Sequence, residues 1–266
     1  MAFGYDLKTI KRSSDTKLIV SKFLLASSED RSVQLINIYK GVPISHNASV
    51  IKVINDRLTL KFHKNHTLCL NMEGRTYIQS KLFPKPIKAR VMTINTTEGY
   101  AILTDLIFSD PSFRKRQHLR IALDYDESTV VSICAPDCNV KLFGKLKDIS
   151  THGVGVIVIA VEDIISKSFS QASQVQIQFY LPFTHPEEAT EIKVPGEIRY
   201  IDRDQENFKL GIQTFPDPDT ETRIEKFITQ RKTEILEEVE NTAPLLALES
   251  GGLHRKYPPE IYSNHS

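Results

Sequence analysis

The chain carries two successive series of short apolar runs, and each series is typical of β-strands. Runs of the first series are rich in β-branched and aromatic residues and are separated by Asn, Asp, Gly and Pro. They lie at 49–55, 57–63, 66–72, 75–83, 87–95 and 100–108. This pattern predicts an antiparallel β domain, a small barrel, that ends near Asp110 and Pro111.

The second series predicts a second barrel. Its runs lie at 119–125, 139–149, 153–161, 174–183, 192–202 and 208–215. In the last of them Phe208, Leu210 and Ile212 alternate with more polar residues or glycine, as in a half-buried strand. Because no long helix separates these runs, we expect closure into a barrel and not a parallel sheet.

Helical patterns flank the two series. Residues 13–40 predict one or two short amphipathic helices, although the second half also fits a strand. Residues 217–240 predict a helix, because the apolar residues Ile224, Phe227, Ile228, Ile235 and Val239 fall on related faces. Beyond Asn241 the apolar residues no longer follow a helical period.

The predicted fold class is therefore all-β with helical extensions. It consists of two tandem small barrels, of which the C-terminal one has six strands and is followed by a helix. The predicted domains are 1–110, a helical segment plus a β-barrel; 111–240, a second barrel with its N-terminal arm and C-terminal helix; and 241–266, a tail.

Composition points to an ordinary folded protein of a reducing compartment. The 266 residues carry a formal net charge of +1, so no global field directs the chain to nucleic acid or anionic lipid. Three cysteines are too few for a disulfide framework. The N-terminus lacks a signal-peptide pattern, and no apolar run approaches the roughly 20 residues that span a bilayer. We expect a cytoplasmic protein without membrane insertion.

Two short motifs carry the candidate chemistry. The segment 112–120 between the predicted barrels contains Arg114, Lys115, Arg116 and Arg120. Alone, such a basic run is typical of a solvated linker. The second motif, Asp148-x-Ser150-x-x-Gly153, follows a predicted strand, and alone it is an ordinary turn sequence.

Together, Arg116-x-x-x-Arg120 and Asp148-x-Ser150-x-x-Gly153 resemble the paired signature of the PilZ family. The 27 residues from 121 to 147 provide room for a strand, a loop and a second strand. The resemblance covers about 111–216 and includes 194–200 and 210–215, which are similar to the closing hairpin of that family. It implies binding of cyclic di-GMP by an arginine-bearing arm that wraps the ligand against the barrel.

The side chains suit this ligand. Cyclic di-GMP presents two phosphates and two guanines, and the guanidinium groups of Arg116 and Arg120 match phosphate oxygens or guanine O6 and N7. Asp148 is expected to accept from guanine N1 and N2. Ser150 adds a hydroxyl contact or braces the turn, and Gly153 lets the backbone approach closely.

Three further positions extend the candidate site. Arg114 and Lys115 lengthen the arm, where Lys115 either touches phosphate or is solvated. Gly211 of the closing hairpin is a further candidate contact. His152 is a departure, because family members frequently carry a glycine there, and this puts the geometry of the loop in question.

The order of the domains resembles the flagellar brake family and its relatives. That resemblance implies a receptor without enzymatic activity and without a cofactor other than its ligand. Because the arm is also the interdomain linker, ligand binding is expected to change the domain arrangement and to signal to a protein partner, such as the flagellar motor or another effector complex.

Three alternatives remain at this point. Cys134 and Cys138 are close enough for a metal site, but no second close pair follows. Asp148, Ser150 and His152 crowd one turn, yet residues in an extended segment do not reach the orientation of a catalytic triad. Small barrels also bind single-stranded nucleic acid through aromatic side chains, for which the candidates are Phe62, Tyr77, Phe179, Tyr180 and Tyr200.

Overall fold

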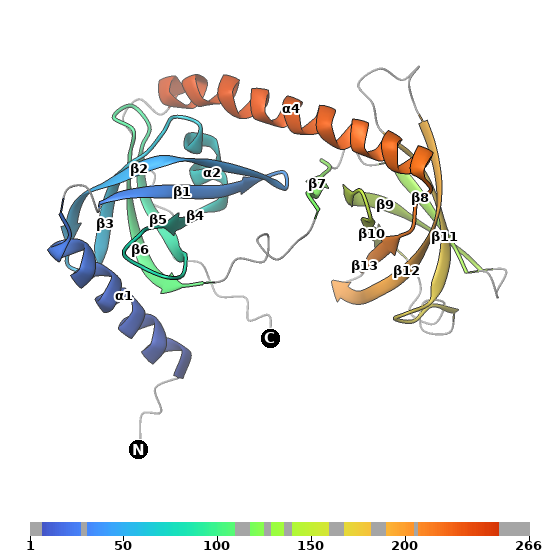
Figure 1. Ribbon diagram of the computed structural model, residues 1–266, viewed down its shortest axis with the longest axis horizontal. Coiled ribbons are helices and arrows are strands. Elements are labelled where there is room, and N and C mark those ends of the chain that lie inside the picture. The colour runs from blue at the N-terminus through green and yellow to red at the C-terminus, as the bar shows by residue number, and fades with distance from the viewer. Residues whose placement is uncertain are drawn as a thin grey trace. The chain divides into compact units, whose positions relative to one another are not determined.

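The computed structural model describes residues 7–27, 31–109, 118–124, 129–135, 140–159, 168–181, 190–204 and 207–249. Two compact units form, and each contains one barrel (Figure 1). The second unit also includes the turn Lys40–Val42, and the division within the last helix falls between Ile235 and Leu236. The expected architecture of two small barrels with helical extensions is confirmed.

The first barrel closes from six strands. They are β1 (Ser32–Tyr39), β2 (Val42–Ile54), β3 (Arg57–Lys61), β4 (Arg75–Gln79), β5 (Ile87–Asn95) and β6 (Tyr100–Phe108). Their order around the ring is β1-β2-β3-β6-β5-β4, and pairing of β1 with β4 closes it. Closure removes the free edges that would otherwise pair with other chains.

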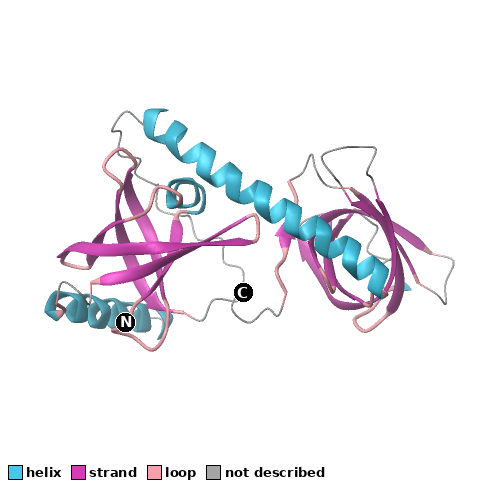
Figure 2. Ribbon diagram, turned by 45° about the horizontal axis from the view of Figure 1, so that its top comes forward, coloured by secondary structure: helices cyan, strands magenta, loops and turns pink. Residues whose placement is uncertain are grey.

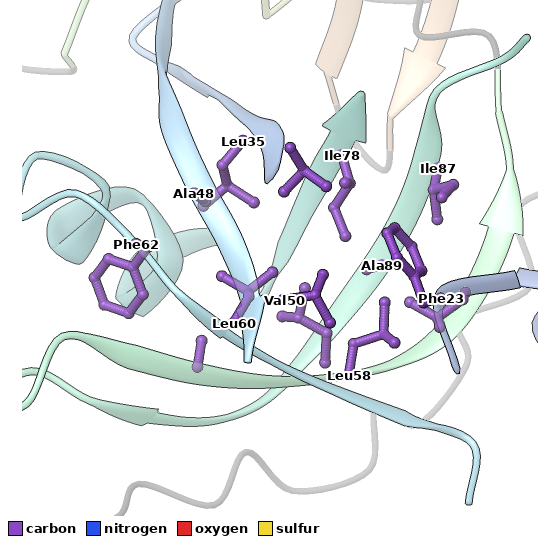
Figure 3. Packing of buried hydrophobic residues seen from close by; sticks show 14 of the residues in the cluster. Phe23, Leu35, Ala48, Val50, Leu58, Leu60, Phe62, Ile78, Ile87 and Ala89 are labelled. Carbon is purple, nitrogen blue, oxygen red and sulfur yellow. The ribbon is translucent and has the colours of Figure 1, made fainter. Parts of the chain in front are cut away.

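Alternating inward side chains fill this barrel. Ala48 and Val50 from β2, Leu58 and Leu60 from β3 and Ile78 from β4 meet in its interior (Figure 3). Helix α1 (Leu7–Leu25) packs along the outside and contributes Phe23, which is fully buried. Burial of one such side chain contributes about 1.5–3 kcal/mol, so α1 is part of the first core.

Residues 66–72 form a helix, and the prediction of a strand there was wrong. Helix α2 spans His66–Glu73 and ends at Gly74, whose φ of 62° is left-handed. The five consecutive residues from His66 to Leu70 are all buried. Five consecutive buried residues give no 3.6-residue period, so the sequence of this helix resembles a buried strand.

A buried polar cluster joins α2 to the first barrel. Asn37 and His66 are both fully buried. The Asn37 Nδ2 donates to the Arg75 carbonyl at 3.0 Å, and its Oδ1 accepts from Thr76 Oγ1 at 3.0 Å. The same Oδ1 lies 3.1 Å from His66 Nδ1. Because a buried polar group without a partner is costly, this cluster fixes how α2 meets β1 and β4.

The second barrel also closes from six strands, with a short seventh beside it. Its strands are β7 (Ile121–Ala122), β8 (Val130–Cys134), β9 (Lys141–Ser150), β10 (Gly153–Val158), β11 (Gln174–Leu181), β12 (Thr190–Asp204) and β13 (Asn207–Thr214). The ring order is β10-β13-β12-β11-β8-β9, and β9 pairs with β10 to close it. Strand β7 pairs only with β9.

The membership of this ring differs from the prediction in one strand. The run 119–125 was expected to supply a barrel strand, but among its described residues, 119–124, the strand is limited to Ile121 and Ala122. The sixth strand is β8, which pairs with both β9 and β11. Three consecutive residues of β8, Val131 to Ile133, are buried, so this strand does not show the alternation of a half-buried strand.

The last helix, α4 (Pro218–Glu249), is longer than predicted (Figure 2). Ile224, Phe227, Ile228, Ile235 and Val239 are buried, as their spacing indicated, and Ala243 continues the same stripe. The helix therefore runs past Asn241 and through Pro244, in a segment that was expected to lack period. Proline removes one donor and so weakens a helix locally without necessarily ending it.

Candidate ligand-binding site

The structure describes five of the eight predicted site residues. Arg120, Asp148, Ser150, Gly153 and Gly211 lie within the described residues, and all five belong to the second unit. Arg114, Lys115 and Arg116 lie outside them. The geometry below therefore concerns the base of the arm and the barrel wall.

Short strand β7 brings Arg120 to Asp148. Ile121 pairs with Ile149 and Ala122 with Asp148, so the residue just before β7 lies near the end of β9. Arg120 Nη1 is 3.3 Å from Asp148 Oδ1. The two side chains are 31% and 22% exposed, so a ligand can still reach both. An ion pair this accessible is worth about 0–1 kcal/mol and is easily exchanged for other contacts.

Ser150 and Gly153 shape the turn between β9 and β10. Ser150 is buried, and its hydroxyl donates to the Gly153 carbonyl at 3.1 Å. A β-carbon at position 153 would lie 3.2 Å from the Ile212 carbonyl oxygen and 3.6 Å from Arg120 Nη2. In this structure Ser150 braces the turn, and Gly153 keeps the space beside Arg120 open.

A row across four strands places Asp148 and Tyr200 on either side of two glycines. Asp148 on β9 pairs with Gly155 on β10, Gly155 pairs with Gly211 on β13, and Gly211 pairs with Tyr200 on β12. Val154, Val156, Leu210 and Ile212, which flank the two glycines along their strands, are buried. The row itself therefore lies on the outer face of the barrel.

Neighbouring side chains cover both glycines. A β-carbon on Gly155 would lie 2.6 Å from Asp148 Oδ2, and one on Gly211 would overlap the Tyr200 ring. Because adjacent strands lie about 4.8 Å apart, the Asp148 carboxylate and the Tyr200 ring lie side by side against the backbone of the two glycines. Tyr200 is 41% exposed. Gly155 and Tyr200 were not among the predicted site residues, although a glycine inside a strand pattern often marks close approach of another group.

Polar side chains continue the outer face beyond this row. Gln213 pairs with Gly153 on one side and with Glu197 on the other. Arg199 Nε donates to Gln213 Oε1 at 2.8 Å, and Arg199 also pairs with Glu197. The face thus combines paired cations and carboxylates with one exposed aromatic ring, which suits a planar, polar and anionic ligand.

Two histidines lie at the margin of the site. The rings of His118 and His152 have centroids 4.7 Å apart at an interplanar angle of 37°. His152 Nε2 lies 3.5 Å from Glu221 Oε1 in the first turn of α4. Among the described residues, His152 Nδ1 is buried and has no hydrogen-bond partner.

The candidate residues for a metal site and for nucleic-acid binding are only partly within the described structure. Cys134 is partly buried, and Cys138 lies outside the described residues. Within the described part of the chain, no three His, Cys, Asp or Glu side chains form a group that could hold a metal ion. Phe62 and Phe179 are buried, whereas Tyr180 is 50% exposed. None of the described helices is long and apolar enough to cross a membrane.

In comparisons with known proteins, the second barrel matches the model of a known domain family. Residues 114–230 match the model of the PilZ domain, which covers that barrel and the start of α4. No curated protein matches the chain by sequence.

Similar solved structures have low identity. YcgR from Escherichia coli in complex with c-di-GMP is 14% identical, with a TM-score of 0.40, over 85% of this chain and 94% of that one. The K. pneumonia MrkH complex with c-di-GMP is 12% identical, with a TM-score of 0.44, over 84% and 96%. The Bacillus subtilis inhibitor of motility MotI is 13% identical, with a TM-score of 0.40, over 77% and 97%. At these TM-scores the similarity carries no argument about function.

Proposed function

We propose that this chain, whose second barrel is a PilZ domain, is a receptor for cyclic di-GMP. One observation supports this most strongly. Within the span that matches the PilZ model, Arg120 at the base of the arm and Asp148 on the barrel wall lie 3.3 Å apart beside a floor of two glycines.

The Arg120–Asp148 pair is proposed to open around a guanine. Its guanidinium donates to guanine O6 and N7, and the carboxylate accepts from guanine N1 and N2 on the other edge. Each good bidentate contact is worth about 1–3 kcal/mol. That exceeds the value of the partly exposed ion pair which it replaces, so the exchange favours binding.

The Tyr200 ring beside Asp148 is proposed to receive the plane of the base. Because Gly155 and Gly211 lack a β-carbon, the Asp148 carboxylate and the Tyr200 ring lie close against the barrel wall. The Tyr200 ring is 41% exposed, so a base can stack on it beside Asp148. An aromatic side chain that stacks on a base contributes about 1–3 kcal/mol. Tyr200 therefore joins Gly211 and Gly153 as a proposed ligand-binding residue.

The rest of the arm is proposed to complete the site. Arg116 supplies the second guanidinium, and Arg114 and Lys115 add phosphate contacts. Ordering this segment on the ligand would change the arrangement of the two domains and would signal to a protein partner in control of motility, biofilm or virulence. We propose that the protein acts in the cytoplasm, without enzymatic activity, nucleic acid or membrane insertion.

Calorimetric titration with cyclic di-GMP tests the proposal. Wild-type protein should bind saturably, and Arg116→Ala, Arg120→Ala and Asp148→Ala should each weaken binding by roughly 5- to 150-fold. Arg57→Ala removes an exposed arginine of the first barrel and should bind like wild type. Unchanged affinity in all three site variants would reject the site.

Oligonucleotide titration addresses the alternative function. If the chain is a single-strand nucleic-acid binder, oligonucleotide affinity should fall steeply with salt and should not respond to cyclic di-GMP. The observed exposure of Tyr180 and Tyr200 makes this a meaningful comparison.

A further inference from the structure

His152 connects the turn of the candidate site to helix α4. It occupies the tip between Ser150 and Gly153, and its Nε2 lies 3.5 Å from Glu221 Oε1. The His152 carbonyl also accepts from the Thr214 backbone N–H at 3.1 Å, at the end of β13. Two separate contacts therefore join this one residue to the segment from β13 into α4.

Helix α4 is firmly anchored where it meets His152. Asp217 Oδ1 accepts from the Thr220 N–H at 2.7 Å, and the Asp217 carbonyl accepts from the Glu221 N–H at 2.8 Å. Ile224 and Phe227 in the next turn are buried. A carboxylate in the first turn is also stabilised by the helix dipole. The backbone of Glu221 is therefore held in place, and a shift of the turn between β9 and β10 would change the distance from His152 to Glu221.

On its other side His152 meets the base of the arm. The His118 ring lies tilted against it, with the centroids 4.7 Å apart, and His118 lies only two residues before Arg120. Because His118 lies in the same segment as Arg120, a ligand that binds this segment can also act on the contact between His118 and His152. A series of contacts therefore runs from His118 at the base of the arm to His152, and from His152 to Glu221 in α4.

We propose that His152 is a positioning residue that transmits ligand binding from the arm to the first turn of α4 through Glu221. This inference rests on the proposed function. It assigns the route by which occupancy of the site reaches a helix outside it. His152 Nδ1, buried without a partner among the described residues, leaves the ring free of any competing hydrogen bond in this geometry.

Amide hydrogen exchange with and without saturating cyclic di-GMP tests the route. In wild-type protein the ligand should slow exchange at Thr220–Ile224 by at least about threefold, since a coupled element gains protection when the ligand stabilises it. His152→Gln and Glu221→Gln should abolish that slowing, while calorimetry still detects ligand binding. Glu225→Gln removes an exposed carboxylate one turn later and should keep the slowing.

A double-mutant cycle separates transmission from a purely structural role. The His152→Gln/Glu221→Gln double variant should lose no more ligand-dependent protection than either single variant, because both act on one contact. Persistence of the slowing in both single variants overturns the inference while leaving the receptor function intact. Failure of wild-type protein to bind the ligand removes both proposals.

Discussion

The carboxylate of Asp148 rests on Gly155, so closely that a β-carbon there would lie 2.6 Å from Asp148 Oδ2. The glycine therefore determines where the acid of the candidate site can lie. Gly211, its partner on β13, does the same for Tyr200. These two relationships give direct tests of the site.

Gly155→Ala should displace Asp148 and weaken cyclic di-GMP binding. Loss of one well-placed carboxylate contact costs about 1–3 kcal/mol, which corresponds to roughly 5- to 150-fold in affinity. The measurement is calorimetric titration, with circular dichroism to verify the fold. Ile157→Val changes the next residue on the same face of β10 and should leave affinity unchanged. Wild-type affinity in Gly155→Ala would contradict the proposed position of Asp148.

Gly211→Ala should destabilise the second barrel, because the new methyl group overlaps the Tyr200 ring. Overpacking of this kind typically costs about 1–3 kcal/mol. Combining it with Tyr200→Ala removes the overlap, so the double variant should recover part of the loss in chemical denaturation. Strictly additive effects would show that the ring does not rest on Gly211.

His66 should be a neutral imidazole with its proton on Nδ1. Asn37 Nδ2 donates to a carbonyl, so Asn37 Oδ1 can only accept, and His66 Nδ1 must donate to it. Burial lowers the pKa of His66 to about 3, and the charges of His46 and His63 act in the same direction. Nitrogen NMR should show this tautomer, with no titration from about pH 5 to pH 8. In Asn37→Ala the preference for Nδ1 should be lost, whereas an unchanged tautomer would contradict the assignment.

Glu73→Gln should stabilise the protein at high pH only. Burial raises the pKa of Glu73 from 4.5 to about 7, against the opposing effects of Arg75 and Asn37. The folded state thus holds a proton that the unfolded chain releases between those values, so its stability falls as pH rises through the window. The side-chain amide of the Glu73→Gln variant does not ionise, so the variant does not lose this stability at high pH. We expect a difference of about 1 kcal/mol in the free energy of unfolding, because the carboxyl is only partly buried. Thermal unfolding should show the gain at about pH 8 and no gain at about pH 4.5; equal gains at both would contradict it.

The sequence predicted the barrels because most of their strands bury one face and expose the other. Where that alternation was absent, prediction failed. Helix α2 begins with five consecutive buried residues, and β8 contains three consecutive buried residues. The extension of α4 beyond Asn241 was hidden by Pro244, which breaks the sequence pattern without ending the helix.

Local motifs in the sequence predicted Arg120, Asp148, Ser150 and Gly153 as candidate site residues, and the structure brings Arg120 and Asp148 within 3.3 Å of one another. The positions of Gly155 and Tyr200 depend instead on register between strands. Irregular pairing between Gly155 and Val156, and between Ile198 and Tyr200, shifts that register by amounts the sequence does not display. The contact from His152 to Glu221 joins residues 69 positions apart and is likewise set by tertiary structure.

A crystal structure of the complex with cyclic di-GMP tests the central claim most directly. We expect a guanine stacked on the Tyr200 ring, with Asp148 accepting from its N1 and N2 and the Arg120 guanidinium turned from Asp148 to O6 and N7. A ligand bound elsewhere on the barrel, with the Arg120–Asp148 pair still closed, would contradict the account.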